Sequence, residues 1–329
     1  MSLPDWFSAK YLAVGALLVG TKLYFRGARC TLSPNLKGKV AIVTGSNVGI
    51  GYCTALRLSE LGATVILACR DPERTQVALE NIKNQTKSSS VEFIKLDLGN
   101  KKSIQDFVNQ FKEKHDRLDI LVNNAGIMNF EKKFTIDSYE ETFGVNYLGP
   151  FMLTELLNDR LTQSAPSRVI NVSSDVARAG KIDFDDLMNT KNFNPLVAYA
   201  NSKFAQTLYT QELHRRYESL GIKAVALEPG IVKTEIFRGL RNKKWASVLS
   251  TLLSPFAWLI MKTPMQGAQT TLHCCLVDHD KLVGGGFYSE CKESNKVNPA
   301  LYDAELSKKL YEESVKLLEL EKDEKVSNS

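Results

Sequence analysis

Short apolar runs alternate with helix-length segments along the chain from Lys39 onward. The apolar runs are rich in Val, Ile and Leu and lack alternating polar positions, which is typical of strands buried on both faces. The expected strands are Val40–Thr44, Thr64–Ala68, Val91–Leu96, Leu118–Val122, Val169–Val172 and Ala224–Leu227. The expected helices between them include Tyr52–Leu61, Lys101–Lys114, Ser138–Leu161 and Ala198–Ser219. This alternation predicts an α/β fold, a doubly wound parallel sheet with right-handed crossovers.

The chain carries no internal repeat and no pattern of a second core. We therefore expect a single folded domain over residues 38–320, preceded by an anchor and linker over 1–37 and followed by a flexible tail over 321–329.

An apolar run from Tyr11 to Thr21 lies near the N-terminus, between Lys10 and Lys22. It is shorter than the roughly 20 residues that a membrane span needs, although aromatic and aliphatic neighbours extend it. A cleaved signal peptide, a soluble amphipathic helix and a non-cleaved anchor are the alternatives. No clear small-x-small cleavage motif follows the run, which disfavours the signal peptide. We expect a non-cleaved membrane anchor.

Basic residues concentrate on the C-terminal side of this run. They are Lys22, Arg26, Arg29, Lys37 and Lys39. The positive-inside rule then predicts that the folded domain lies on the cytosolic side of its membrane.

Composition excludes two classes of function. The formal net charge is only +5, and basic residues are mixed with acidic ones rather than gathered in a stripe, so we expect no nucleic-acid partner. The six cysteines and four histidines show no metal-ligand spacing, so we expect no metal site. The cysteine pattern suits a reducing compartment.

A glycine-rich turn follows the first expected strand and precedes a helix. In such a turn Gly45 permits the sharp bend, Gly49 lets the backbone approach a pyrophosphate, and Gly51 lets the helix pack on the strand. The helix N-terminus offers N–H groups and a positive dipole to phosphate. A structural glycine turn is the alternative. The predicted cofactor-binding residues of this loop are Gly45, Ser46, Asn47, Val48, Gly49, Ile50 and Gly51.

The end of the second strand predicts the choice of cofactor. Enzymes that use NAD place an acidic residue there, about 20 residues beyond the loop, to hold the ribose hydroxyls. This chain has Cys69 at that place, followed by Arg70. A guanidinium can pair with the 2′-phosphate of NADP(H). The alternative is a surface Arg70 that pairs with Asp71 or Glu73.

The strongest chemical signal is Tyr199 with Lys203 one helical turn later. Residues four apart share a helix face, and an ammonium close to a phenol favours the phenolate and lowers its pKa. The pair alone has little specificity, so its context decides. That context is the buried strand Val169–Val172, which runs into Ser173 and Ser174. A serine at a strand end can hydrogen-bond a substrate oxygen, or it can simply cap a turn.

Six separate sequence elements occur in an order and spacing that resemble the short-chain dehydrogenase/reductase family. They are TGSNVGIG (44–51), NNAG (123–126), Asn146, Ser174, YANSK (199–203) and Pro229-Gly230. The resemblance covers roughly 38–320 and implies a Rossmann fold. It also implies a catalytic tetrad and further cofactor contacts. The tetrad is Asn146, Ser174, Tyr199 and Lys203, and the cofactor contacts are Asp97, Asn124, Tyr199, Lys203, Val232 and Thr234.

The resemblance implies a mechanism in which hydride passes between nicotinamide and a carbonyl carbon. Tyr199 would exchange the proton, Ser174 would hold the substrate oxygen, Lys203 would lower the pKa of the phenol, and Asn146 would anchor a water.

A second apolar patch, Trp245 to Met261, falls where this family builds its substrate lid, although a core helix is the alternative. Segments 67–71, 121–128, 143–149, 262–270 and 288–292 resemble the membrane-bound retinol dehydrogenase branch. This implies a lipophilic alcohol or carbonyl substrate, foremost retinol and retinal, and residence on the endoplasmic reticulum. Several alternatives remain open. The location could be a mitochondrial membrane or a lipid droplet, the substrate a steroid or polyprenol, and the function that of a non-catalytic NADP-binding sensor. A homo-oligomer is also an open alternative.

Overall fold

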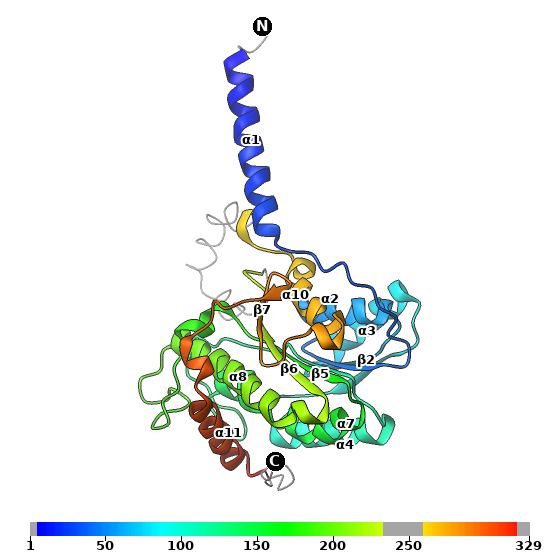
Figure 1. Ribbon diagram of the computed structural model, residues 1–329, viewed down its shortest axis with the longest axis vertical. Coiled ribbons are helices and arrows are strands. Elements are labelled where there is room, and N and C mark those ends of the chain that lie inside the picture. Colours follow the sequence, from blue (N-terminus) through cyan, green and yellow to red (C-terminus); the bar gives the residue numbers. More distant parts are fainter. Residues whose placement is uncertain (1–4, 233–258, 321–329) are drawn as a thin grey trace.

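The computed structural model describes residues 5–232 and 259–320, with side chains from residue 13 onward. One eight-stranded sheet runs through the described body, in the order β3-β2-β1-β4-β5-β6-β7-β8 (Figure 1). All neighbouring strands are parallel except β8, which pairs antiparallel with β7. The strands are β1 (Val40–Thr44), β2 (Thr64–Cys69), β3 (Val91–Lys95), β4 (Ile120–Asn123), β5 (Ser167–Val172), β6 (Ile222–Leu227), β7 (Phe287–Ser289) and β8 (Lys292–Glu293).

This sheet confirms the predicted fold class and all six expected strands within a few residues. The strand order reverses beside β1, because β2 and β4 lie on its two sides. Such a switch point opens a crevice at the carboxyl ends of the strands, where ligands bind in open α/β sheets. The short β7 and β8 were not among the expected strands.

Helices cover both faces of the sheet (Figure 1). Two buried clusters of apolar side chains, one on each face, form the core between helices and sheet. One face carries α2 (Gly49–Glu60), α3 (Pro72–Thr86) and α10 (Pro264–Leu276), and the other carries α4 (Lys101–Lys114), α6 (Gly149–Leu156), α7 (Asn158–Gln163), α8 (Pro195–Tyr217) and α11 (Ala304–Leu318).

The single helix expected over Ser138–Leu161 is divided. It consists of α5 (Glu141–Phe143), the π-helical η1 (Gly144–Leu148), α6 and α7. Gly149 packs so closely on the backbone of Leu98 that a Cβ could not be accommodated, and Pro150 follows it. The prediction of a helix is thus correct over most of this segment, although the helix begins at Glu141 rather than Ser138, contains a π-helical stretch and is interrupted at Leu157.

Short 3₁₀ segments complete the described chain. They are η2 (Asp175–Ala179), η3 (Glu218–Leu220), η5 (His279–Lys281) and η6 (Pro299–Tyr302).

A buried carboxyl group, Glu155, joins α6 to the helices beneath it. It accepts hydrogen bonds from Tyr209 at 2.7 Å, Tyr311 at 2.9 Å and Tyr217 at 3.0 Å, which ties α8 and α11 to α6.

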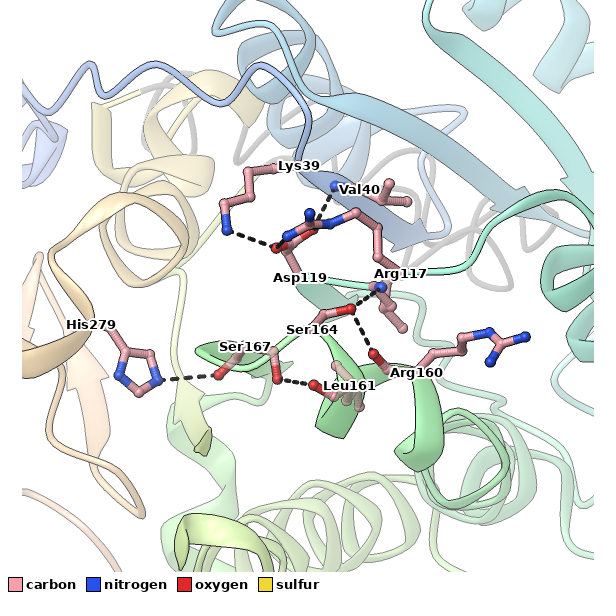
Figure 2. Close-up of polar contacts among 10 residues, drawn as sticks. Lys39, Val40, Arg117, Asp119, Arg160, Leu161, Ser164, Ser167 and His279 are labelled. Atoms are coloured by element: carbon pink, nitrogen blue, oxygen red, sulfur yellow. Dashed lines mark hydrogen bonds and ion pairs between the residues drawn. The ribbon is translucent and has the colours of Figure 1, made fainter. Parts of the chain in front are cut away.

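A buried carboxylate also secures the amino ends of the central strands. Figure 2 shows Asp119, just before β4, between the side chains of Lys39 and Arg117. Asp119 Oδ2 accepts the Val40 N–H at 2.9 Å, and Oδ1 lies 2.6 Å from Arg117 Nη2. These contacts join β1 to β4 at the edge of the sheet opposite the carboxyl ends.

The first helix, α1 (Asp5–Arg26), extends away from the body (Figure 1). Its exposed apolar side chains include Val14, Leu17, Val19 and Leu23. Among the residues that the structure describes, α1 included, no helix is both long enough and apolar enough to cross a bilayer.

Candidate active site

The glycine-rich loop between β1 and α2 forms an open cradle at the carboxyl end of the sheet. Gly49 has a φ of 64°, and a Cβ added there would meet nothing within 4 Å. Within the described residues 48–52, where α2 begins, no side chain caps the helix and its first turn contains no acidic residue. The first N–H groups of the helix and its positive dipole end are therefore available to an anion such as a pyrophosphate.

Asn124, which follows β4, braces this cradle. Its Nδ2 donates to the Thr44 carbonyl at 2.8 Å, and its backbone N–H donates to Thr44 Oγ1 at 2.9 Å. A Cβ at Gly51 would collide with this amide and would lie 2.5 Å from the Gly45 carbonyl. The absence of a side chain at Gly51 thus lets α2, β1 and β4 meet.

Of the other predicted loop residues, some are buried and support the loop, and others are partly exposed in the cradle. Ser46 is buried, and its backbone N–H donates to Cys69 Sγ at 3.1 Å. Ile50 is buried in the core, whereas Asn47 and Val48 are partly exposed in the cradle.

Arg70 directly follows β2 and is exposed. Neither alternative partner considered from the sequence pairs with it, and no ion pair of Arg70 occurs among the described residues. Asp71 instead caps α3, where its Oδ1 accepts the Arg74 N–H at 3.1 Å. The guanidinium is therefore free to meet an anion beside the cradle.

Three further residues predicted to contact the cofactor differ in their structural surroundings. Asp97 holds the turn after β3, because its Oδ1 accepts the Gly99 N–H at 3.0 Å. Val232 is buried and pairs with Lys262 in an isolated parallel bridge. Thr234 lies outside the described residues, as does most of the predicted lid over Trp245 to Met261.

Ser174 and Tyr199 meet beyond the carboxyl end of β5. Ser174 follows this strand by two residues, and Tyr199 lies in the second turn of α8. The Ser174 hydroxyl lies close enough to the phenol of Tyr199 to lower its pKa. Ser173 points the other way, since its Oγ lies 3.0 Å from the Lys203 carbonyl and 2.9 Å from Thr207 Oγ1. Of the two serines, Ser174 is the one that faces the phenol.

The pKa of Tyr199 does not follow the expectation from sequence. Burial raises it to about 12, and the nearby Ser174 hydroxyl is the group that lowers it. Lys203 is not among the causes of this shift, and desolvation of the phenol is the largest of them. At neutral pH Tyr199 is therefore a protonated acid.

Lys203 is fully buried on the same face of α8 as Tyr199, and burial lowers its pKa to about 7. Its Nζ donates to the Val172 carbonyl at 2.8 Å and to Gln206 Oε1 at 3.3 Å. Gly126 gives it room, because a Cβ there would lie 3.3 Å from the ammonium. The position of Lys203 is thus fixed at the end of β5.

Asn146 lies in the π-helical η1, and π-helical turns are frequent at functional sites. Its Oδ1 accepts the Ile127 N–H at 2.8 Å, while its Nδ2 donates to the Ile127 carbonyl and to Ser202 Oγ. Ser202 lies on α8 between Tyr199 and Lys203. Asn146 therefore links the loop after β4 to the helix that carries the other two residues.

Sequence reasoning missed Thr44, Ser202 and Gln206. Gln206 lies three residues beyond Lys203 on α8, so helical spacing alone could have placed it beside the ammonium. Its Nε2 is buried without a hydrogen-bond partner among the residues described. No comparable signal marked Thr44, whose role depends on a contact with β4.

A nicotinamide dinucleotide fits these residues. The cradle has space where side chains would stand, α2 opens toward it, and the phenol and hydroxyl lie at the neighbouring strand end. A parallel sheet with a phosphate cradle and a Ser–Tyr–Lys group at its carboxyl edge defines a dinucleotide-dependent oxidoreductase.

Comparison with known proteins identifies the family. Residues 39–245 match the short chain dehydrogenase family, and the chain belongs to it. It is 40% identical to mouse retinol dehydrogenase 13 over 93% of this chain and 92% of that protein. It is 42% identical to human retinol dehydrogenase 11 over 80% of each chain. The crystal structure of an uncharacterized protein from Mycobacterium paratuberculosis has a TM-score of 0.71 at 28% identity, covering 89% of this chain and 98% of that one.

Proposed function

We propose that this dehydrogenase uses NADP(H) to interconvert a lipophilic alcohol and its aldehyde or ketone, with retinol and retinal the foremost pair. The observation that carries the proposal is the meeting of Ser174 with Tyr199 at the end of β5, one helical turn from Lys203.

The proposed chemistry divides between cofactor and protein. A bound nicotinamide supplies or accepts the hydride. Tyr199 holds the exchangeable proton on its Oη, and its raised pKa of about 12 keeps that proton in place at pH 7. The chain is therefore suited to donating a proton to a carbonyl oxygen, which is the direction of reduction. Ser174 orients the same oxygen, and Lys203 and Asn146 hold the helix and the loop around it.

The preference for NADP(H) is supported at the end of β2. Arg70 is exposed and has no ion-pair partner among the described residues, and the acidic residue typical of NAD enzymes is replaced by the buried Cys69. A 2′-phosphate would complete the pairing of this guanidinium.

The lipophilic substrate is supported by the relatives, which are named retinol dehydrogenases at about 40% identity. The apolar side chains of α1 are spread around the helix rather than confined to one stripe, and such a helix favours an apolar environment. We therefore propose that α1 associates with a cytosol-facing membrane, foremost that of the endoplasmic reticulum, where such substrates dissolve.

The test is a substrate screen on the detergent-purified full chain. Retinal, a steroid ketone and a polyprenal are each offered with NADPH and with NADH, and the alcohol product is quantified by chromatography. We expect the highest kcat/KM with retinal and NADPH. Higher activity on the steroid or polyprenal would replace the substrate in the proposal, and turnover of none would favour a non-catalytic NADP-binding sensor.

A further inference from the structure

An ion pair with a buried lysine lies where α1 joins the body. Lys262 Nζ is 2.5 Å from Glu290 Oε1, and only 8% of the Lys262 side chain is exposed. Glu290 Oε2 also accepts the backbone N–H of Ala28 at 2.5 Å. The carboxylate of this pair, Lys262 with Glu290, therefore contacts the first residues after α1. The lysine is largely shielded from water, whereas 39% of the Glu290 side chain is exposed.

The end of α1 is shaped to fit this pair. Gly27, the first residue after the helix, has a φ of 75°, and a Cβ there would lie 2.6 Å from Lys262 Nζ and closer still to the Glu290 carboxylate. On the other side of the contact, Lys22 of α1 donates to the Met261 carbonyl at 3.0 Å. Lys22 is thus joined to the segment that leads into α10, and Ala28 is joined to the turn between β7 and β8.

Glu290 occupies a strained turn. It and Cys291 join β7 to β8, and both have positive φ, 51° and 58°, although neither is a glycine. Such a conformation is unfavourable for residues other than glycine, and it persists where surrounding contacts enforce it. Partial burial raises the pKa of Glu290, but the Lys262 ammonium and the Ala28 N–H lower it below its ordinary value, so the carboxylate remains charged.

The same pair contacts the loop that leaves β6. The Lys262 ammonium lies 3.0 Å from where a Cβ on Gly230 would stand, and the Lys262 backbone N–H donates to the Ile231 carbonyl at 2.7 Å. Val232 then borders Gly267 of α10, together with Ile50 from the first turn of α2. The contacts therefore continue from the end of α1 to the phosphate cradle.

We propose that Lys262 and Glu290 are positioning residues for the dinucleotide site. They fix the loop after β6 to the end of α1, so that a change at the junction of α1 with the body alters affinity for the cofactor. This inference rests on the proposed use of NADP(H). It assigns a role in cofactor binding to two residues that belong neither to the glycine-rich loop nor to the group around Tyr199.

The experiment measures NADPH dissociation constants for the full chain by cofactor fluorescence, alongside melting temperatures. The variants are Lys262→Met, Glu290→Gln and Gly27→Ala. We expect each to weaken NADPH binding about tenfold, the usual range of coupling between linked sites. Gly38→Ala is the matched control, since Gly38 also has positive φ, 80°, but its Cβ would meet nothing within 4 Å.

Several outcomes would overturn the proposal. If Lys262→Met and Glu290→Gln lower the melting temperature but leave the NADPH dissociation constant within about twofold of wild type, the pair is only structural. If Gly27→Ala and Gly38→Ala weaken binding equally, α1 is not coupled to the site. Should a single variant fail to fold, the double variant Lys262→Met/Glu290→Gln, which leaves no unpaired charge, gives the measurement.

This readout is independent of the substrate. A wild-type chain that binds NADPH but reduces no aldehyde would contradict the proposed function, while weaker NADPH binding by the three variants would still support the positioning role.

Discussion

At the residue scale, burial controls the two ionisable groups of the site more strongly than either group controls the other. Desolvation raises the pKa of Tyr199 to about 12 and lowers that of Lys203 to about 7. Both shifts favour the neutral form, as expected when a charge loses its water. A phenol that keeps its proton at pH 7, next to a serine hydroxyl, is a general acid awaiting a carbonyl oxygen.

Tyr199→Phe tests that role directly. The substitution removes the phenolic oxygen and leaves the ring that fills the space, so we expect kcat to fall by at least about a hundredfold, the usual contribution of general acid catalysis. The NADPH dissociation constant should stay close to that of wild type. Steady-state kinetics and a fluorescence titration measure the two quantities. A variant with near-normal kcat would show that another group supplies the proton.

Arg70→Asp tests the choice of cofactor. The exposed guanidinium has no carboxylate partner among the described residues, so its removal should cost little stability. We expect the ratio of kcat/KM for NADPH to that for NADH to fall by about a hundredfold, because a carboxylate repels the 2′-phosphate and can hold the ribose hydroxyls. Lys114→Asp, an equal change of charge at the exposed end of α4, is the control. An unchanged ratio in Arg70→Asp would refute the assignment.

At the scale of elements, the central strands β1, β2, β4, β5 and β6 were predictable because both of their faces are largely buried, whereas the edge strand β3 is only partly buried. A continuous apolar run of five or six residues reports such burial directly, and β1 and α4 begin and end where the sequence predicted. β7 and β8 escaped prediction because they are short. β8 is also exposed, so its pairing depends on the turn at Glu290 rather than on an apolar pattern.

The site was predictable to the extent that its residues follow strand ends and helical spacing. Tyr199 and Lys203 are one turn apart in sequence and on one helix in the structure. Asn146 was identified only through family resemblance, since its contacts with Ile127 and Ser202 join segments far apart in the chain. Long-range contacts of this kind leave no periodic trace in the sequence.

The junction of β1 with β4 gives a prediction about stability. Although burial raises it, the contacts with Arg117, the Val40 N–H and Lys39 hold the pKa of Asp119 below its ordinary value. A carboxylate with a lowered pKa contributes stability above its unfolded pKa of about 3.9, and that contribution is lost as the pH falls through the folded value. We expect Asp119→Ala to lower the free energy of unfolding by about 2 kcal/mol at pH 7.

Urea unfolding between pH 7 and pH 3 measures this effect. The difference between Asp119→Ala and wild type should shrink below about pH 4. Asp106→Ala is the control, because Asp106 forms only an exposed pair with Lys102 and should change stability by less than about 0.5 kcal/mol. A difference for Asp119→Ala that is constant across this range would contradict the electrostatic origin.

At the scale of the whole molecule, the place where α1 leaves the body is the same side on which the site opens. Lys22 and Ala28 contact the segment around Lys262 and Glu290, and Lys262 in turn contacts the loop that follows the carboxyl end of β6. Asp119 lies at the opposite edge of the sheet. An apolar helix on the ligand side would bring an apolar phase close to the entrance of the site.

The last prediction tests whether α1 binds a membrane. Leu17 and Leu23 are 69% and 59% exposed, and each would enter an apolar phase if α1 did. Replacing both by Glu should lower partitioning into phosphatidylcholine vesicles at least about a hundredfold, because charged side chains are costly there. Ile136→Glu/Val283→Glu is the control, since Ile136 is 77% exposed on the body and Val283 also lies at its surface. Co-sedimentation with vesicles measures partitioning, and turnover of a water-soluble aldehyde checks that the site is intact. If the Leu17 and Leu23 substitutions leave the protein on the vesicles, or if the control pair removes it equally, α1 is not what holds this enzyme to lipid, and the source of its apolar substrate must be sought elsewhere.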